Sequence, residues 1–200
     1  MDEKQRQRYL ADVDRVLQEV REELALAQDD NDELRALHLL LQVMRAIHED
    51  IGVHTLIKLI LDGALAFAEA ERAFILLLSP NGEARLKMGR NSAGEYLRAR
   101  DCTLSSRVVQ TALLRHRPII LPDAQGDVPY SKWDSIVKLK VRTVIAAPLR
   151  VRDQAIGLLY VDSRRPLLRY SPHHLSVMTA LADQAAQALA RAQKFDTYQG

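Results

Sequence analysis

The chain contains a single cysteine, Cys102, among its 200 residues. One cysteine excludes an internal disulfide and any metal site that requires several thiolate ligands. No apolar stretch reaches the roughly 20 residues that a transmembrane helix needs. The N-terminus is charged and acidic, unlike a secretory signal. We therefore expect a cytoplasmic protein without a membrane partner.

An excess of charge of one sign is also lacking, because 28 basic and 26 acidic side chains leave a formal net charge of only +2. Residues 138–169 are mostly basic and residues 29–33 are mostly acidic. Such local imbalance is typical of a solvated rim, so we expect no nucleic-acid partner. Hydrophobic residues make up 48% of the chain and charged residues 27%, which allows a buried core. The length suits one domain with an appendage.

Glycine and proline are absent from residues 1–51, which are dense in helix-forming residues. The apolar positions alternate at spacings of three and four, as in a coiled-coil seam. These positions are Leu10, Val13, Leu17, Val20, Leu24 and Ala27. We expect a helical, coiled-coil segment over residues 1–36 that joins two copies of the chain, in parallel or antiparallel orientation. The alternative is a solitary amphipathic helix that folds back on its own domain, and the helix either continues through Asp29–Asp32 or breaks there.

The most informative stretch consists of two apolar runs of strand length, Val141–Leu149 and Ala155–Asp162. The connection between them is too short for a crossover helix, so the runs predict an antiparallel hairpin. Neither run alternates with polar residues, which indicates that both faces of the hairpin are covered. Pro148 and Gly157 argue against buried helices as the alternative.

Periodicity, turn residues and caps predict the remaining elements. In chain order they are a buried helix over 53–67, a strand over 73–78, a turn at 79–82, a strand over 84–88 with one dry face, a further strand start at 96–97, a helix capped by Thr103, a strand over 119–121, a loop over 122–129, a short helix capped by Ser131 and a last helix that begins at Ser171-Pro172. The last helix has a face rich in alanine, which allows close approach of another helix. We expect Leu181, Ala185 and Leu189 to contribute to dimerisation together with the N-terminal seam.

This order of elements and several short motifs resemble the GAF family. The motifs are Leu121-Pro122-Asp123-Ala124, the Val141-Arg142-Thr143 entry to the hairpin, Pro148-Leu149 and the run from Ile156 to Asp162. The resemblance covers about residues 38–192. It implies an α+β fold with a six-stranded antiparallel sheet, terminal helices on one face and a small-molecule pocket on the other. We accordingly expect a GAF domain at residues 37–194 and a tail at 195–200.

No subtype of that family is matched. The Asn-Lys…Phe…Asp-Glu pattern of cyclic-nucleotide-binding members is absent, and Cys102 is followed by Thr103 rather than by the His of bilin-binding members. Free methionine sulfoxide reductases share the fold but need a resolving cysteine, which this chain lacks. The six histidines show no metal-ligand spacing. We predict no enzyme, no catalytic residue and no metal site, and a cofactor stays unidentified.

The resemblance also implies a ligand pocket between the sheet and its roof of short helices. Its wall residues, by position on a GAF fold, are Phe74, Leu76, Ile119, Leu121, Asp123, Tyr130, Trp133, Ile136, Thr143, Ile145 and Tyr160. Tyr130 and Trp133 would stack on a planar ligand, whereas Asp123 and Thr143 would supply hydrogen bonds. The alternative is that these side chains fill the space and that no ligand binds.

Two functions are compatible with these features. The first is a sensory or regulatory domain that homodimerises through its terminal helices and acts on an output domain or a partner protein of the kinase, cyclase or transcriptional-activator type. Members of the resembling family mostly serve as such sensors. The second is a dimeric scaffold with a filled pocket.

Overall fold

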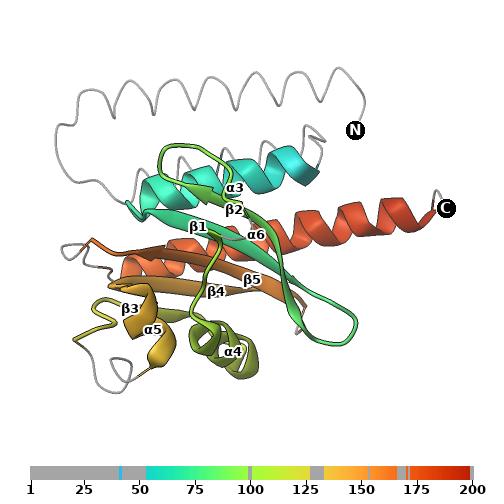
Figure 1. The fold of residues 1–200 in the computed structure, drawn as a ribbon. Coiled ribbons are helices and arrows are strands. Elements are labelled where there is room, and N and C mark those ends of the chain that lie inside the picture. Colours follow the sequence, from blue (N-terminus) through green and yellow to red (C-terminus); the bar gives the residue numbers. More distant parts are fainter. Residues whose placement is uncertain are drawn as a thin grey trace. The chain divides into compact units, whose positions relative to one another are not determined.

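The structure is a computed structural model that describes residue 41 and residues 53–98, 101–126, 133–152, 154–165, 170 and 172–198. The chain divides into two compact units, Met1–Gln42 and Val43–Gly200. The helices and strands described below belong to the second unit (Figure 1). The predicted coiled-coil seam, its boundary at residue 36 and the stretch Asp29–Asp32 lie outside the described residues.

The second unit is built on an antiparallel sheet with the strand order β2-β1-β5-β4-β3. The strands are β1 (Arg72–Leu78), β2 (Ala84–Asn91), β3 (Ile119–Leu121), β4 (Thr143–Val151) and β5 (Gln154–Ser163). β4 and β5 form the predicted hairpin, with Thr143 opposite Ser163 and Val151 opposite Gln154. β5 also pairs with β1, so the hairpin lies at the centre of the sheet. The prediction of a central antiparallel ribbon is confirmed.

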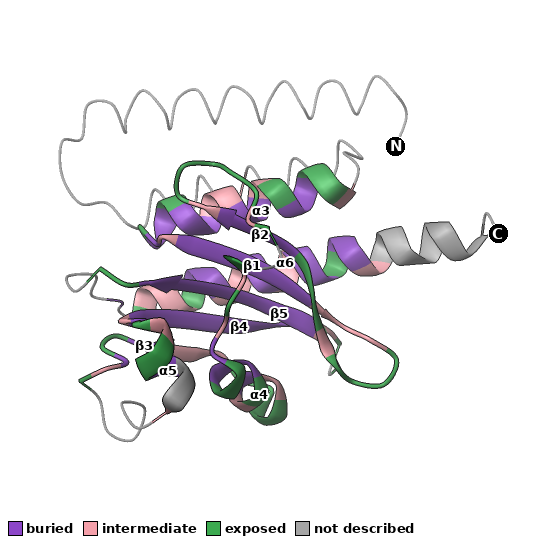
Figure 2. Cartoon of the chain, in the orientation of Figure 1, coloured by how far each residue is buried: buried purple, intermediate pink, exposed green. Residues whose placement is uncertain are grey.

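Both faces of this hairpin are covered, as its unbroken apolar runs predicted. Ile145 and Leu158 have no exposed surface, and Figure 2 shows nearly the whole of β4 and β5 as buried. α3 (Val53–Phe67) and α6 (Pro172–Tyr198) cover one face, while α4 (Ser106–Arg115) and α5 (Asp134–Leu139) cover the other (Figure 1). Pro148 is tolerated within β4 because β3 ends its pairing at Ala146, so that among the described strands only β5 pairs with the stretch around Pro148.

The described sheet has five strands, whereas the resemblance implied six. Tyr96 forms one isolated bridge, to Arg90, and the Leu97 N–H donates to the Gly89 carbonyl oxygen at 2.9 Å. These contacts cover the edge of β2 but are too few to make a strand. The chain turns tightly before them because the Asn91 side chain accepts hydrogen bonds from the backbone N–H groups of the turn that follows it.

β2 does not have the continuous dry face that its alternation predicted. Met88 is 7% exposed, but Leu86 is 38% exposed. β2 is an edge strand, and only its second half packs into the domain. A register shift after Ile75 also interrupts the alternation of the β1–β2 pair. The turn before β2 is confirmed, with a φ of +78° at Gly82.

Two helices begin later than predicted. Ser105, not Thr103, caps α4, since its Oγ accepts from the Val108 N–H at 3.4 Å, where the apolar run of the helix starts. α5 begins at Asp134 with Trp133 at the N-cap position, rather than with a cap at Ser131. The start of α6 at Pro172 is as predicted, because proline suits the first helical position. This helix continues to Tyr198, past residue 195, where we expected a tail.

Candidate ligand-binding face

The sheet face beneath α4 and α5 gathers most of the predicted pocket residues. Five of them belong to one buried cluster. These five are Phe74, Leu76, Leu121, Ile136 and Tyr160. Ile119 and Trp133 pack against its rim. Val108 and Ala112 of α4 close the cluster from above, and neither has exposed surface. These seven predicted residues are therefore brought together by β1, β3, β5, α5 and the N-cap of α5.

Thr143 and Ile145 are not brought into this cluster. Their neighbours Val144 and Ala146 face it, and successive side chains of a strand point to opposite faces. Both therefore point toward the side covered by α3 and α6, although both were predicted as pocket floor. The Thr143 hydroxyl lies there beside Tyr170, a buried residue between β5 and α6.

Of the two remaining predicted residues, the structure describes only Asp123, which does not belong to the cluster. Asp123 is exposed in the loop after β3. Its Oδ1 accepts a hydrogen bond from the Gly126 N–H at 3.1 Å and lies 3.7 Å from Arg142 Nη1. The carboxylate thus stabilises its own loop. Tyr130 lies outside the described residues.

A buried ion pair stands at one end of this face, and the sequence analysis missed it. Arg72 Nε and Nη2 donate to the two carboxylate oxygens of Asp162 at 2.8 and 2.6 Å. Asp162 has no exposed surface and Arg72 is 8% exposed. Burial alone would lower the pKa of Arg72, but the hydrogen bonds to Asp162 and its negative charge together outweigh burial and raise that pKa, so the guanidinium stays charged. The sequence did contain one signal of this pair, because Asp162 is a charged residue at the end of the otherwise apolar run of β5.

Aromatic side chains continue the site from this pair. The Arg72 guanidinium lies 5.4 Å from the centre of the Phe74 ring, which contacts the Tyr160 ring edge-on at 6.0 Å between centroids. Burial raises the pKa of Tyr160 well above its usual value, and the Asp162 carboxylate acts in the same direction. Tyr160 therefore stays protonated and offers a hydroxyl next to a fixed charge pair. The face combines an apolar wall with one polar end.

Cys102 lies at the β2 side of the same face. A Cβ placed on Gly89 would lie 3.2 Å from its Sγ and 2.8 Å from the Phe74 ring, so the thiol fills a crowded site. Burial raises the pKa of the Cys102 thiol, and Arg72 offsets that only in part. A nucleophilic cysteine has a lowered pKa. Cys102 therefore has the character of a small apolar filler rather than of a nucleophile.

Two of the cavities that described residues form lie away from this face. One, of about 530 Å³, is lined by polar and apolar residues at and just after the C-terminal end of α3, by the turn after β2 and by Arg165. The other, of about 460 Å³, runs between the start of α3 and β2. Within the described ranges, no group of three or more His, Cys, Asp or Glu side chains could hold a metal ion.

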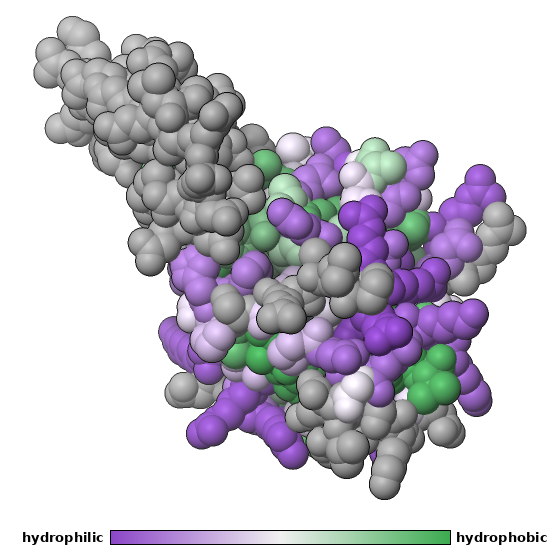
Figure 3. All heavy atoms as spheres, turned by 90° about the vertical axis from the view of Figure 1, so that its left-hand side faces the viewer, coloured by the Kyte–Doolittle hydropathy of each residue, from purple (hydrophilic) through white to green (hydrophobic). Residues whose placement is uncertain are grey.

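The predicted dimerisation residues of α6 are already buried within one chain. Leu181 and Ala185 have no exposed surface, and Leu189 is 2% exposed. α6 packs on β4, β5 and α3. Figure 3 shows mostly hydrophilic described side chains on the side of the domain it views, with small, separate hydrophobic areas. No described helix is long and apolar enough to cross a membrane.

The family model of the GAF domain matches residues 52–189, which is more than half of the chain. The chain belongs to the GAF family. The resemblance inferred from the central hairpin and its flanking motifs is thereby confirmed. GAF domains are regulatory and sensory modules of signalling proteins. No curated protein matches the sequence.

Solved structures agree with this family. The GAF domain of a phosphoenolpyruvate-protein phosphotransferase from Coxiella burnetii aligns with a TM-score of 0.64 at 16% identity, over 84% of this chain and 99% of that chain. The equivalent domain from Acinetobacter aligns with a TM-score of 0.64 at 18% identity, over 83% and 97%. A free methionine-R-sulfoxide reductase from Neisseria meningitidis aligns with a TM-score of 0.64 at 15% identity, over 84% and 95%. Identities this low show a shared fold alone.

Proposed function

We propose that this GAF domain is a sensory module that binds a small molecule under α4 and α5, homodimerises through its terminal helices and controls an output domain or a partner protein. The unequal cover of the two sheet faces carries this proposal. α3 and α6 contain 15 and 27 residues, whereas α4 and α5 contain 10 and 6. Short, partly exposed elements open locally at lower cost than long packed helices. Entry of a ligand is therefore favoured on the α4–α5 side.

The side chains on that face favour a ligand with an apolar or planar body. Phe74, Tyr160 and the half-buried Trp133 provide aromatic surface. The ion pair at the end of the face and the Tyr160 hydroxyl would orient a polar group of the ligand.

Thermal unfolding with a panel of nucleotides, amino acids and other metabolites tests this binding. A ligand at about 100 times its Kd stabilises a protein by about 2.7 kcal/mol, which raises the Tm of a domain of this size by roughly 5–10 °C. Trp133→Ala should reduce the shift, because it removes the aromatic rim. Leu114→Ala is the matched control on the same roof, since Leu114 is 80% exposed and should leave the shift unchanged. A shift that both variants retain would place the ligand elsewhere.

Dimerisation is proposed to depend on the N-terminal seam, because the α6 residues first expected to contribute are buried in their own chain. Charged substitutions at Leu17 and Leu24 should convert the dimer to a monomer. Light scattering coupled to size exclusion measures this directly. A dimer that persists in the double variant would contradict the coiled-coil interpretation.

An output partner is proposed from the proteins in which similar GAF domains occur. One solved neighbour belongs to a phosphoenolpyruvate-protein phosphotransferase and another to a methyl-accepting chemotaxis protein. Partner capture by the full chain, compared with the Leu17/Leu24 variant, tests whether the partner requires the dimer.

A dimeric scaffold with a filled pocket is the second candidate, and the burial of the cluster favours it. Phe74, Ile136, Leu158 and Tyr160 have no exposed surface, so these side chains fill the space between the sheet and its roof. A scaffold would show no stabilising ligand in the panel but would keep its dimer and its partner.

Catalysis is not part of the proposal. The similar reductase is an enzyme, but this chain has one cysteine, and the pKa of that thiol is raised. Turnover of free methionine-R-sulfoxide that disappears with Cys102→Ser would contradict this view.

A further inference from the structure

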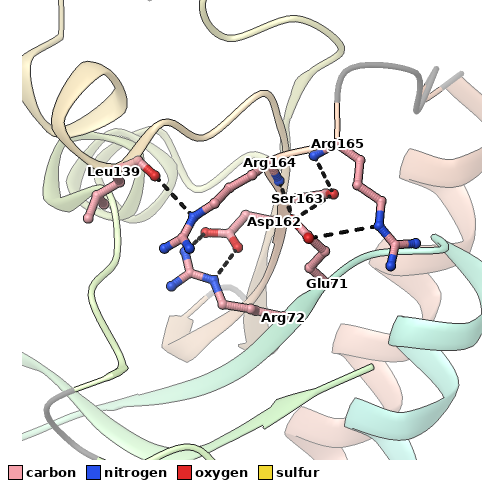
Figure 4. A network of polar contacts seen from close by, with 7 residues as sticks. All are labelled: Glu71, Arg72, Leu139, Asp162, Ser163, Arg164 and Arg165. Carbon is pink, nitrogen blue, oxygen red and sulfur yellow. Dashed lines mark hydrogen bonds and ion pairs between the residues drawn. The ribbon is translucent and has the colours of Figure 1, made fainter. Parts of the chain in front are cut away.

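Basic side chains from three segments gather at the end of the sheet where β4 begins and β5 ends. This basic end patch consists of Lys138, Lys140, Arg142 and Arg164. The Arg142 N–H donates to the Ser163 carbonyl oxygen at 2.8 Å, so Arg142 lies beside the residue that precedes Arg164. Arg164 Nε donates at 3.1 Å to the carbonyl oxygen of Leu139, the residue between the two lysines (Figure 4). The four residues therefore lie close together in the fold.

The basic end patch is open to solvent. Lys138, Lys140 and Arg164 are exposed, and the side chain of Arg142 is 41% exposed. Neither lysine side chain forms a hydrogen bond or an ion pair within the part of the chain that the structure describes. Their charges are thus available to a partner.

The carboxylates at this end of the sheet neutralise the patch only in part. Asp162 is held by Arg72, and the Glu71 carboxylate accepts hydrogen bonds at the start of the connection to α6 (Figure 4). Among the described residues, Asp123 alone forms an ion pair with the patch, with its Oδ1 at 3.7 Å from Arg142 Nη1. An exposed excess of one charge attracts partners of the opposite charge.

The backbone at Lys140 indicates that the position of this charge matters. Lys140 is the C-cap residue of α5 and has a φ of +55°, in the left-handed region. Glycine is favoured at this place because it has no Cβ, whereas any other residue is strained there. The lysine therefore gives up some stability of the domain and places an exposed cation just beyond the helix. Such a residue is a candidate for function rather than for folding.

An apolar side chain borders the patch. Val137 is 56% exposed and directly precedes Lys138 in α5. Protein interfaces combine apolar contacts with polar and charged groups at their rim. Surfaces that bind single-stranded nucleic acid combine cations with aromatic side chains on which bases stack, and neither Val137 nor any patch residue is aromatic. The chemistry favours a protein segment over a nucleic acid.

We propose that the basic end patch is the docking surface for an acidic segment of a partner protein, one that also carries an apolar side chain. The carboxylates of the segment pair with the patch, and its apolar side chain covers Val137. The inference deepens the proposed function and rests on it for the existence of a partner. Because the charges are exposed, the contact is weakened by salt.

Fluorescence anisotropy tests the docking, with the full chain titrated into a labelled peptide of Asp-Glu-Leu-Glu repeats at about 0.1 M salt. The peptide should bind, and about 0.5 M salt should weaken its binding. Lys138→Gln combined with Lys140→Gly should raise the Kd roughly fivefold, since each exposed ion pair changes an affinity by about 1.4- to 5-fold. Lys140→Gly should keep or raise the Tm, because it relieves the left-handed backbone, so weaker binding would not reflect unfolding.

A gain of affinity is expected when the patch loses its carboxylate partner. Asp123→Asn keeps an oxygen that accepts the Gly126 N–H but removes the negative charge beside Arg142. The Kd of the peptide should fall about twofold.

Arg85→Gln combined with Lys87→Gln is the matched control, because it removes the same charge from exposed residues of β2. Arg85 pairs with Leu77, five residues along β1 from Arg72, which pairs with Asp162 at the patch end. That separation is roughly 17 Å at about 3.3 Å per residue, and it exceeds the screening length of about 10 Å at 0.1 M salt. The Kd should stay unchanged in this variant.

The docking surface is refuted if the peptide does not bind at about 1 mM protein, if salt has no effect, or if the control variant weakens binding as much as the patch variant. It is also refuted if a labelled oligothymidylate binds as tightly as the peptide and loses binding in the patch variant. The patch would then select for negative charge alone.

The outcome separates the docking surface from the rest of the proposed function. Failure of the peptide to bind would remove the docking surface and leave ligand binding and dimerisation to their own tests. A metabolite panel without any stabilising compound would remove the sensory role and leave the peptide result in place.

Discussion

Asp162→Asn should destabilise the domain by about 3–5 kcal/mol, because breaking a buried ion pair leaves its partner charged and unpaired. The amide keeps the shape of the side chain but removes the counter-charge from Arg72, which is only 8% exposed. It also weakens the two hydrogen bonds, now at 2.8 and 2.6 Å. The total stability of a domain is usually about 5–15 kcal/mol. The loss is therefore a large part of the whole.

The cost arises from the orphaned charge rather than from the pair as such. Replacing both partners, with Arg72→Met and Asp162→Val, should be less destabilising than Asp162→Asn alone, since buried pairs are often replaced by apolar residues at little cost. The matched control is the surface pair of Arg85 and Glu83, whose side chains are 70% and 67% exposed at 3.3 Å. Arg85→Met should change the stability by no more than about 0.5 kcal/mol.

Urea unfolding followed by far-ultraviolet circular dichroism measures these differences, provided that the slope of the transition stays constant across the variants. Asp162→Asn with an effect no larger than that of Arg85→Met would refute the reasoning. The reasoning would also be refuted if Arg72→Met and Asp162→Val together destabilised the domain by the sum of their separate effects, because the two residues would then act independently.

Three further predictions concern packing, capping and the thiol. Gly157→Ala should lower the free energy of unfolding by about 3 kcal/mol, near the upper end of overpacking effects. The new Cβ would lie 2.1 Å from the Leu76 carbonyl oxygen. An unchanged Tm in thermal unfolding would contradict this prediction. Ser105→Ala should lower the free energy of unfolding by about 1 kcal/mol through loss of the α4 cap, whereas Thr103→Ala should leave it unchanged. A larger effect of Thr103→Ala than of Ser105→Ala would show that Thr103 caps the helix. Cys102 should react with iodoacetamide more slowly than free cysteine near pH 8, because burial raises its pKa and lowers the thiolate fraction; faster reaction in the folded protein would refute the shift.

The sequence by itself determined the central ribbon and the family. The apolar runs of β4 and β5, joined by a short connection, predicted an antiparallel hairpin covered on both faces, and Ile145 and Leu158 are fully buried. The order of the helices and strands and the start of α6 at Pro172 also followed from local patterns, whereas the starts of α4 and α5 and the dry face of β2 were predicted wrongly. These features depend on residues close together in the chain, where periodicity and turn chemistry act directly.

The tertiary structure alone decided which side chains meet on the candidate face. Alternate residues of β4 face opposite sides of the sheet, and Thr143 and Ile145 face α3 and α6. An unbroken apolar run does not indicate which alternate set faces which side. Arg72 and Asp162 are 90 residues apart, and they meet only because β1 pairs with β5 in one register. The Arg164 contact with α5 likewise requires the end of β5 to lie beside a helix from another part of the chain. Contacts between distant segments are set by register and packing of the whole sheet, which no local window of sequence contains.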